Sequence, residues 1–204
     1  MIAAIVLAAG ESQRMGQNKL LMRLNDDTLL ESILNSVTTA DIGKTVVVLG
    51  HKPEEIMGVL KNWQRRVTIV INENYKRGMT SSFQRGLQQA LSADAAFLVL
   101  GDQPILDQNY LNIMIREMEH NLGKALIVSP IHKGKRGHPI LFHRRLFDEI
   151  LDLEETETMR DVVHRHVEEL LTVEAPRWAI MDIDTPEDYE RIRRLFKRDI
   201  HTLR

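Results

Sequence analysis

The chain of 204 residues contains no cysteine, which excludes disulfides, thiolate nucleophiles and cysteine-ligated zinc or iron–sulfur sites. Its formal net charge is only −2, so it lacks the basic field on which nucleic-acid binding relies, and we expect no nucleic-acid partner. It also has no apolar run near the ~18 residues that a membrane helix needs, so we expect no membrane partner. The 43% hydrophobic and 27% charged residues are typical of a soluble globular protein.

The N-terminus is apolar but carries no charged leader, and it runs directly into a glycine-containing loop. We therefore interpret residues 2–9 as a first strand and not as a signal peptide, and we expect a cytoplasmic protein. No linker, repeat or low-complexity tract interrupts the sequence, so residues 1–204 are expected to form a single domain.

Strand-like and helix-like segments alternate along the first 129 residues. The apolar runs that predict strands lie at residues 2–9, 45–49, 67–71, 95–100 and 125–129. The segments that predict helices begin after Thr28, at Pro53, near Thr80 and after Asp107. This alternation is typical of a mostly parallel sheet that is covered by helices on both faces.

The remainder of the chain is less regular. We expect an extended segment at residues 140–142 and a last helix that Thr185 caps, with Pro186 in its first turn. Two further helices are predicted at residues 145–153 and 158–170, and two strand-like segments at residues 171–174 and 178–184.

The stretch from Gly10 to Lys19 has the composition of a phosphate-binding loop. Gly10 and Gly16 can adopt positive φ and turn backbone N–H groups into one concavity, beside which Arg14 and Lys19 would add positive charge. The spacing matches neither the P-loop nor the glycine motif of dinucleotide-binding folds. The alternative is an ordinary turn that carries two solvated cations.

Carboxylates at two places could hold Mg²⁺. Asp102 follows the strand that ends at Leu100, and the carboxyl ends of parallel strands open into one crevice, where it would meet the first loop. Its alternative role is that of a turn or capping aspartate. Asp182 and Asp184 would share a face if they lay on a strand, and either is a candidate second ligand. Asp184 could instead help to cap the last helix.

Two other segments carry weaker signals. Gly78 and the serines at 81 and 82 precede a helix, where a hydroxyl and the helix N-terminus could hold a ribose or a phosphate, although such residues are ordinary caps. Gly137 and His138 offer a backbone turn and an imidazole, but a lone histidine is more often a structural hydrogen-bonding group than a catalyst.

Five segments resemble, in order, those of the molybdenum cofactor cytidylyltransferases (the MocA group) and of the related MobA-type guanylyltransferases. They are residues 7–19, 78–82, 100–104, 137–142 and 182–188. The resemblance implies a three-layer α/β/α Rossmann-like nucleotidyltransferase fold with a mostly parallel central sheet. It also implies transfer of CMP from CTP to the terminal phosphate of molybdopterin, with release of pyrophosphate and a requirement for Mg²⁺.

The resemblance further implies a role for each matching residue. Catalysis would depend on Lys19, Arg14 and Asp102, and the metal would be held by Asp102 with Asp182 or Asp184. The acceptor would lie against Gln103, Pro104, Gly137, His138 and Pro139. The nucleotide would be bound by Leu7, Ala8, Ala9, Gly10, Glu11, Ser12, Arg14, Met15, Gly16, Lys19, Gly78, Ser81, Ser82 and Asp102.

Several alternatives stay open. Ala8-Ala9-Gly10 is similar to the cytidylyl type, but the same chemistry could use GTP or another NTP, or a sugar phosphate as acceptor. A protein of a different class would be a non-catalytic partner that delivers cofactor to a molybdenum hydroxylase such as xanthine dehydrogenase. A Rossmann-like protein that binds another phosphorylated metabolite is the third possibility.

For the transferase, the acceptor phosphate already carries the nucleophilic oxygen, so catalysis would consist of alignment and charge neutralisation.

Overall fold

The computed structural model describes residues 1–198 of the chain. The strands are β1 (Ile2–Ala8), β2 (Arg23–Leu24), β3 (Asp27–Thr28), β4 (Lys44–Leu49), β5 (Thr68–Ile71), β6 (Ala95–Leu100), β7 (Ile127–His132), β8 (Lys135–Arg136), β9 (Ile140–His143) and β10 (Leu170–Glu174). The α-helices are α1 (Leu29–Thr39), α2 (Pro53–Leu60), α3 (Met79–Leu87), α4 (Gln108–His120), α5 (Phe147–Leu151), α6 (Met159–Arg165) and α7 (Pro186–Arg198). Short 3₁₀ turns are η1 (Gln13–Met15), η2 (Lys19–Leu21), η3 (Tyr75–Arg77), η4 (Arg144–Leu146), η5 (Val167–Glu169) and η6 (Arg177–Ile180).

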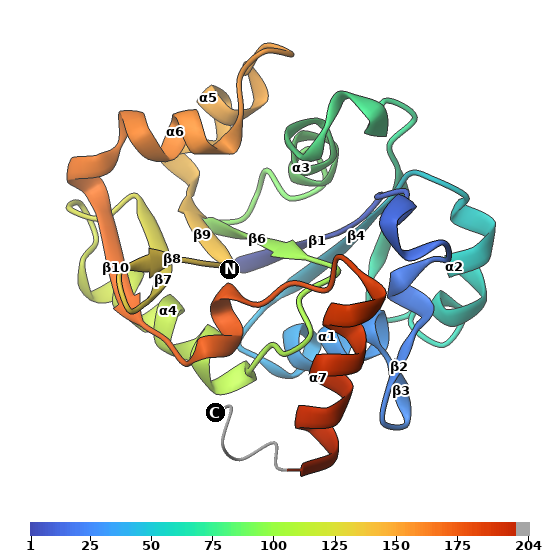
Figure 1. Cartoon of the computed structure of the whole chain (residues 1–204). Coiled ribbons are helices and arrows are strands. Elements are labelled where there is room, and N and C mark those ends of the chain that lie inside the picture. The colour runs from blue at the N-terminus through green and yellow to red at the C-terminus, as the bar shows by residue number, and fades with distance from the viewer. Residues whose placement is uncertain (199–204) are drawn as a thin grey trace.

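The central sheet has the strand order β10-β7-β9-β6-β1-β4-β5, with β8 paired to β7 (Figure 1). Strand β1 lies between β4 and β6 and is parallel to both, β5 is parallel to β4, and β10 is parallel to β7. Strand β9 is antiparallel to both of its neighbours, and β8 is antiparallel to β7. The prediction of a mostly parallel sheet is therefore confirmed.

Helices cover both faces of the sheet, as the alternation predicts. Side chains of β1 alternate between two cores: Ala4 and Val6 belong to the core under α1, α2 and α4, and Ala3 and Ile5 to the core under α3, α5 and α6. Because successive side chains of a strand point to opposite faces, a strand that is buried on both sides has to be apolar throughout. This requirement explains the continuous apolar run at the start of the chain.

Helix ends follow the expected capping signals. The Thr28 hydroxyl accepts a hydrogen bond from the Glu31 amide, and the Glu31 carboxylate accepts one from the Thr28 amide, which completes a capping box at α1. Asp107 accepts a hydrogen bond from the Asn109 amide at the start of α4. These contacts lie within one turn of each helix, so the sequence alone could indicate where α1 and α4 begin.

The less regular second part departs from the expectations in three places. Residues 178–184 do not form a strand, because η6 occupies Arg177–Ile180 and the chain then runs irregularly to α7. The helix expected at residues 158–170 ends at Arg165, and a 3₁₀ turn with strand β10 follows it. The helix expected at residues 145–153 is divided into η4 and the short α5. In the described part of the chain, no helix combines the length and apolarity needed to cross a membrane.

Helix α3 lies unusually close to the sheet at Gly86. A Cβ atom at this position would lie 2.2 Å from Ile5 Cγ2 and 2.8 Å from Val48 Cγ2. The missing side chain therefore lets the helix backbone rest directly on β1 and β4.

We expect Gly86→Ala to lower the free energy of unfolding by about 1–3 kcal/mol, because the added methyl group overpacks a full core. Gly58→Ala in α2 is the matched control, since a Cβ there meets nothing within 4 Å. It should leave stability unchanged or raise it by up to about 1 kcal/mol, because alanine favours a helix. Urea unfolding of both variants measures the difference, and equal stabilities would contradict the assigned contact.

His166 links α5 to the end of α6. Its Nε2 lies 2.7 Å from a Glu149 carboxylate oxygen and its Nδ1 lies 3.2 Å from Glu169, while Arg165 pairs with Glu149 and Glu157. Burial lowers the pKa of His166, but the hydrogen bonds to Glu149 and Glu169 outweigh it, so the pKa is raised. The charged imidazolium is thus the form that the folded protein favours.

A histidine whose pKa is higher in the folded protein than in the unfolded chain stabilises the fold when it is charged. This contribution is fully present below the unfolded-state pKa of about 6.5, and it is lost as the pH rises through the folded-state pKa. We expect His166→Gln to be less stable than the wild type by about 0.5–1 kcal/mol near pH 5.5. The two proteins should converge above pH 8. Thermal unfolding across this range tests the sign, and a difference that grew with pH would contradict it.

Candidate functional site

A cavity of about 800 Å³ opens at the carboxyl ends of β1 and β6. Four segments that are distant in the sequence form its wall: the first loop, the loop from η3 into α3, the end of β6, and Asp184. The lining residues are Leu7, Ala9, Gly10, Glu11, Ser12, Gln13, Arg14, Lys19, Leu20, Tyr75, Lys76, Gly78, Met79, Ser82, Leu100, Gly101, Asp102 and Asp184. The volume is within the range typical of small-molecule sites.

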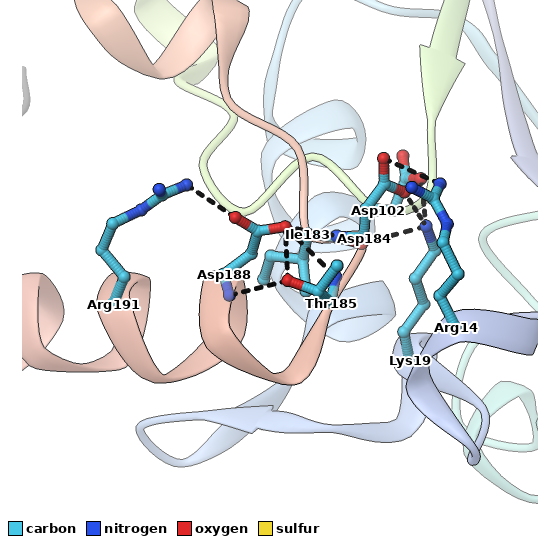
Figure 2. A network of polar contacts seen from close by, with 8 residues as sticks. All are labelled: Arg14, Lys19, Asp102, Ile183, Asp184, Thr185, Asp188 and Arg191. Atoms are coloured by element: carbon cyan, nitrogen blue, oxygen red, sulfur yellow. Dashed lines mark hydrogen bonds and ion pairs between the residues drawn. The ribbon is translucent and has the colours of Figure 1, made fainter.

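Lys19 stands at the centre of the polar contacts in this cavity. Its Nζ donates to Asp102 Oδ2 at 2.5 Å, to the Ile183 carbonyl oxygen at 3.0 Å and to Asp184 Oδ1 at 3.2 Å (Figure 2). The Lys19 side chain is only 14% exposed, so these ion pairs are partly shielded from water. The structure thus brings together a cation from the first loop and carboxylates that lie 83 and 165 positions later.

Local contacts shape the loop that presents Lys19. Ser12 and Gly16 flank η1 with φ values of 51° and 68°, and the Ser12 hydroxyl accepts a hydrogen bond from the Lys19 amide at 3.2 Å. Asn18 accepts a hydrogen bond from the Leu20 amide, which starts the turn η2. Gly10 does not take the positive φ that its sequence permits, and Ser12 takes a left-handed conformation instead.

Four residues expected at the nucleotide lie outside the cavity wall, of which three belong to the first loop or the strand before it. Ala8 and Met15 are buried in the hydrophobic core beneath the loop. Gly16 forms the exposed corner of the turn after η1. Ala8 and Met15 therefore support the loop from behind, whereas Gly16 faces solvent.

Asp184 faces the first loop. Arg14 Nη2 lies 3.0 Å from Asp184 Oδ2, although the Arg14 side chain is 68% exposed at the rim of the cavity. The capping role that Asp184 could have played belongs to Asp188, which accepts hydrogen bonds from the amides of Asp184 and Thr185. Likewise, the cap of α4 is Asp107, so the Asp102 carboxylate remains directed at Lys19.

Asp182 lies beside this cluster without joining the cavity wall. Partial burial, and then the negative charges of Asp102 and Asp184, raise the pKa of Asp182 above its ordinary value. Among the described residues, no three His, Cys, Asp or Glu side chains are arranged to hold a metal ion together. The shared contact with Lys19 therefore pairs Asp102 with Asp184 and leaves Asp182 apart.

The serines near the start of α3 lie in different places. Ser82 lines the cavity, and its hydroxyl accepts a hydrogen bond from Asn72 Nδ2 at 3.0 Å. Ser81 faces a separate recess, where its hydroxyl donates to the carbonyl oxygens of Gly78 and Asn74. Of the two serines, Ser82 is the one in contact with the cavity.

The part of the cavity wall that η3 contributes was not predicted from the sequence. Tyr75, Lys76 and Met79 line the cavity, and the Tyr75 hydroxyl lies 3.2 Å from His51 Nδ1. Gly50 permits this close approach, because a Cβ there would lie 2.6 Å from Tyr75 Cβ. The signal was present, since the loop after β5 also leaves the carboxyl edge of the parallel sheet.

The residues expected to face an acceptor form a layer of their own beside the main cavity. Gln103 Nε2 donates to the His138 carbonyl oxygen at 2.8 Å, and the His138 amide donates to the Ala179 carbonyl oxygen at 2.9 Å. A Cβ on Gly137 would lie 2.0 Å from that same Ala179 oxygen. Pro139 is buried, and Pro104 lines a smaller recess of about 280 Å³. Asp102, which precedes Gln103 in the chain, is the point at which these residues adjoin the cavity.

Burial lowers the pKa of His138 to about 4, so its imidazole is neutral at neutral pH. In the described part of the chain, neither His138 Nδ1 nor Gln103 Oε1 has a hydrogen-bond partner, although both atoms are buried. Buried polar groups are normally paired. These two atoms are therefore exceptions to this rule among the residues assigned to the acceptor.

Comparison with known proteins adds to this geometry. The chain is 29% identical over 189 residues to the molybdenum cofactor cytidylyltransferase of Escherichia coli, which covers 92% of this chain and 93% of that protein. It is 26% identical to the purine catabolism protein PucB of Bacillus subtilis, over 95% of this chain and 96% of that protein.

A solved nucleotidyl transferase from Methanothermobacter thermautotroptrophicus superposes with a TM-score of 0.82 at 27% identity, over 97% of this chain and 98% of that chain. Residues 4–170 match the family described as the MobA-like NTP transferase domain. This match spans the sheet from β1 to β9 and includes the first loop and Asp102. With more than half of its length matched, the chain belongs to the family of MobA-like NTP transferase domains.

Proposed function

We propose that this protein is a single-domain, Mg²⁺-dependent cytidylyltransferase that moves CMP from CTP to the terminal phosphate of molybdopterin and releases pyrophosphate. The convergence of Lys19 with Asp102 and Asp184 in one cavity carries the proposal. The 29% identity with the molybdenum cofactor cytidylyltransferase of Escherichia coli, over 92% of this chain, supports the choice of cytosine as base and molybdopterin as acceptor.

The residues around Lys19 fit a magnesium ion. Two carboxylates and one carbonyl oxygen already surround a positive charge there, and Mg²⁺ prefers oxygen ligands. A pair of carboxylates also leaves room for phosphate oxygens and water, which Mg²⁺ sites usually keep. We therefore propose Asp102 and Asp184 as the metal ligands. Bound there, Mg²⁺ would neutralise part of the triphosphate charge.

The mechanism depends on Lys19 and Arg14. Both cations pair with carboxylates in the free protein, and a bound triphosphate offers them stronger partners, because it carries more negative charge. Lys19 would then stabilise the charge that develops at the α-phosphorus as pyrophosphate leaves. His138 would be a weak base, since its pKa is about 4, which suits a reaction whose acceptor phosphate is already ionised.

Two alternatives remain worth testing. The same chemistry with GTP, or on a sugar phosphate, would use the same loop and carboxylates. Non-catalytic delivery of cofactor to a molybdenum hydroxylase, such as xanthine dehydrogenase, is supported by the similarity to a purine catabolism protein, because xanthine is a purine. Pyrophosphate release separates the transferases from the delivery partner.

We expect pyrophosphate release when the protein is mixed with CTP, Mg²⁺ and molybdopterin, at a rate at least tenfold above that with ATP, GTP or UTP. Omission of Mg²⁺ should abolish the signal. A faster rate with GTP than with CTP would show that the enzyme transfers GMP and not CMP. Silence with all four nucleotides and a competent acceptor would favour the delivery partner.

Lys19→Met should lower kcat on the order of 10²–10³-fold, as loss of a single preorganised charge-stabilising group does in other enzymes. Arg14→Met is the comparison variant for the second cation of the mechanism, which lies at an exposed position in the same loop. It should lower kcat by about tenfold or less. Circular dichroism checks that both variants fold. An unchanged kcat in Lys19→Met would remove this residue from the mechanism.

A further inference from the structure

Asp184 lies directly before α7, and its backbone is held by a residue that the proposed mechanism does not use. Asp188 Oδ2 accepts hydrogen bonds from the Thr185 hydroxyl at 2.9 Å and from the Thr185 amide at 3.1 Å (Figure 2). The Asp184 amide approaches the same oxygen at 3.4 Å. In return, the Asp188 amide donates to the Thr185 hydroxyl at 3.2 Å.

The other oxygen of this carboxylate is also engaged. Arg191 Nη2 donates to Asp188 Oδ1 at 2.8 Å, from one turn further along α7. The Asp188 side chain is 23% exposed, whereas that of Arg191 is 62% exposed. The ion pair is therefore the weaker restraint, because exposed pairs contribute little, and the contacts of Oδ2 with the backbone are the stronger one.

The segment that carries Asp184 is restrained on its other side as well. The Ile183 amide donates to the Asp102 carbonyl oxygen at 3.3 Å, and the Ile183 carbonyl oxygen accepts from Lys19 Nζ. Residues 183–185 are thus tied to the strand end that carries Asp102 and to the first turn of α7. An ordinary capping box needs only the contacts with Thr185; the contact with the Asp184 amide is additional.

We propose that Asp188 is a positioning residue, which fixes the backbone of Asp184 so that its carboxylate meets Asp102 at the point that Lys19 Nζ marks. This inference rests on the proposed function, in which Asp102 and Asp184 hold the metal. Small displacements of a positioned group reduce rates strongly, so loss of this restraint slows the reaction although Asp188 does not touch the substrate.

The chain contains a matched control for the capping effect. Thr158 and Asp161 form the same box at the start of α6, where Asp161 Oδ2 accepts from the Thr158 amide and the Thr158 hydroxyl, both at 2.7 Å. Helix α6 lies over the opposite face of the sheet from α7 (Figure 1). Asp161→Ala therefore removes an equivalent cap and leaves the cavity intact.

The experiment compares Asp188→Ala, Asp161→Ala and Asp188→Asn. Loss of either cap should lower Tm by about 2–4 °C. Only Asp188→Ala should also lower kcat/KM by at least tenfold, mainly through kcat. Asparagine keeps a side-chain oxygen that can accept the same hydrogen bonds from residues 184 and 185, so Asp188→Asn should recover activity to within about threefold of the wild type. Equal kcat/KM values in the two alanine variants would show that Asp188 is a cap alone, and a failed rescue by asparagine would also overturn the proposal.

Amide hydrogen exchange tests the restraint without any turnover. Asp188→Ala should accelerate exchange at Asp184 and Thr185 by at least tenfold, and Asp161→Ala should leave both amides unchanged. This measurement separates the two proposals: absence of pyrophosphate release from the wild type would overturn the proposed function, whereas unaltered exchange at Asp184 in Asp188→Ala would overturn the positioning role by itself.

Discussion

The contact of the Lys19 ammonium group with Asp102 and Asp184 is the interaction around which the cavity is organised. Without a positive charge at this point, two neighbouring carboxylates would repel each other in a partly shielded site. The same arrangement gathers two cations and two carboxylates at one place, and under the proposed function these are the groups that a magnesium-bound triphosphate would contact. In the free protein these cations and carboxylates pair with one another, and in the proposed reaction they would pair with the substrate and the metal instead.

The sheet makes this contact possible. Strands β1 and β6 are parallel neighbours, so their carboxyl ends bring the first loop and Asp102 to the same edge. Asp184 arrives from the far end of the chain, through a segment that is bonded to Asp102 and to α7. Helix α3 rests on the sheet through Gly86, and Met79 and Ser82 of the same helix line the cavity.

Much of the fold could be predicted from local patterns. The apolar runs located the buried strands, and Thr28, Asp107 and Thr185 located helix starts, because capping depends on contacts within one turn. Residues 178–184 were assigned wrongly, since an apolar run of this length is equally compatible with a buried turn. The contribution of Tyr75 was missed, because it depends on the close approach that Gly50 permits between two loops.

The sequence by itself determined the parallel sheet, the basic first loop and the aspartate that follows β6. Each of these features is encoded by the type and spacing of a few neighbouring residues. Only the tertiary structure decided that Asp184, rather than Asp182, shares Lys19 with Asp102. It also decided that Asp188 holds the backbone of Asp184. The physical reason is that these choices depend on how the segment before α7 meets a strand end some eighty residues earlier, and no local pattern encodes that contact.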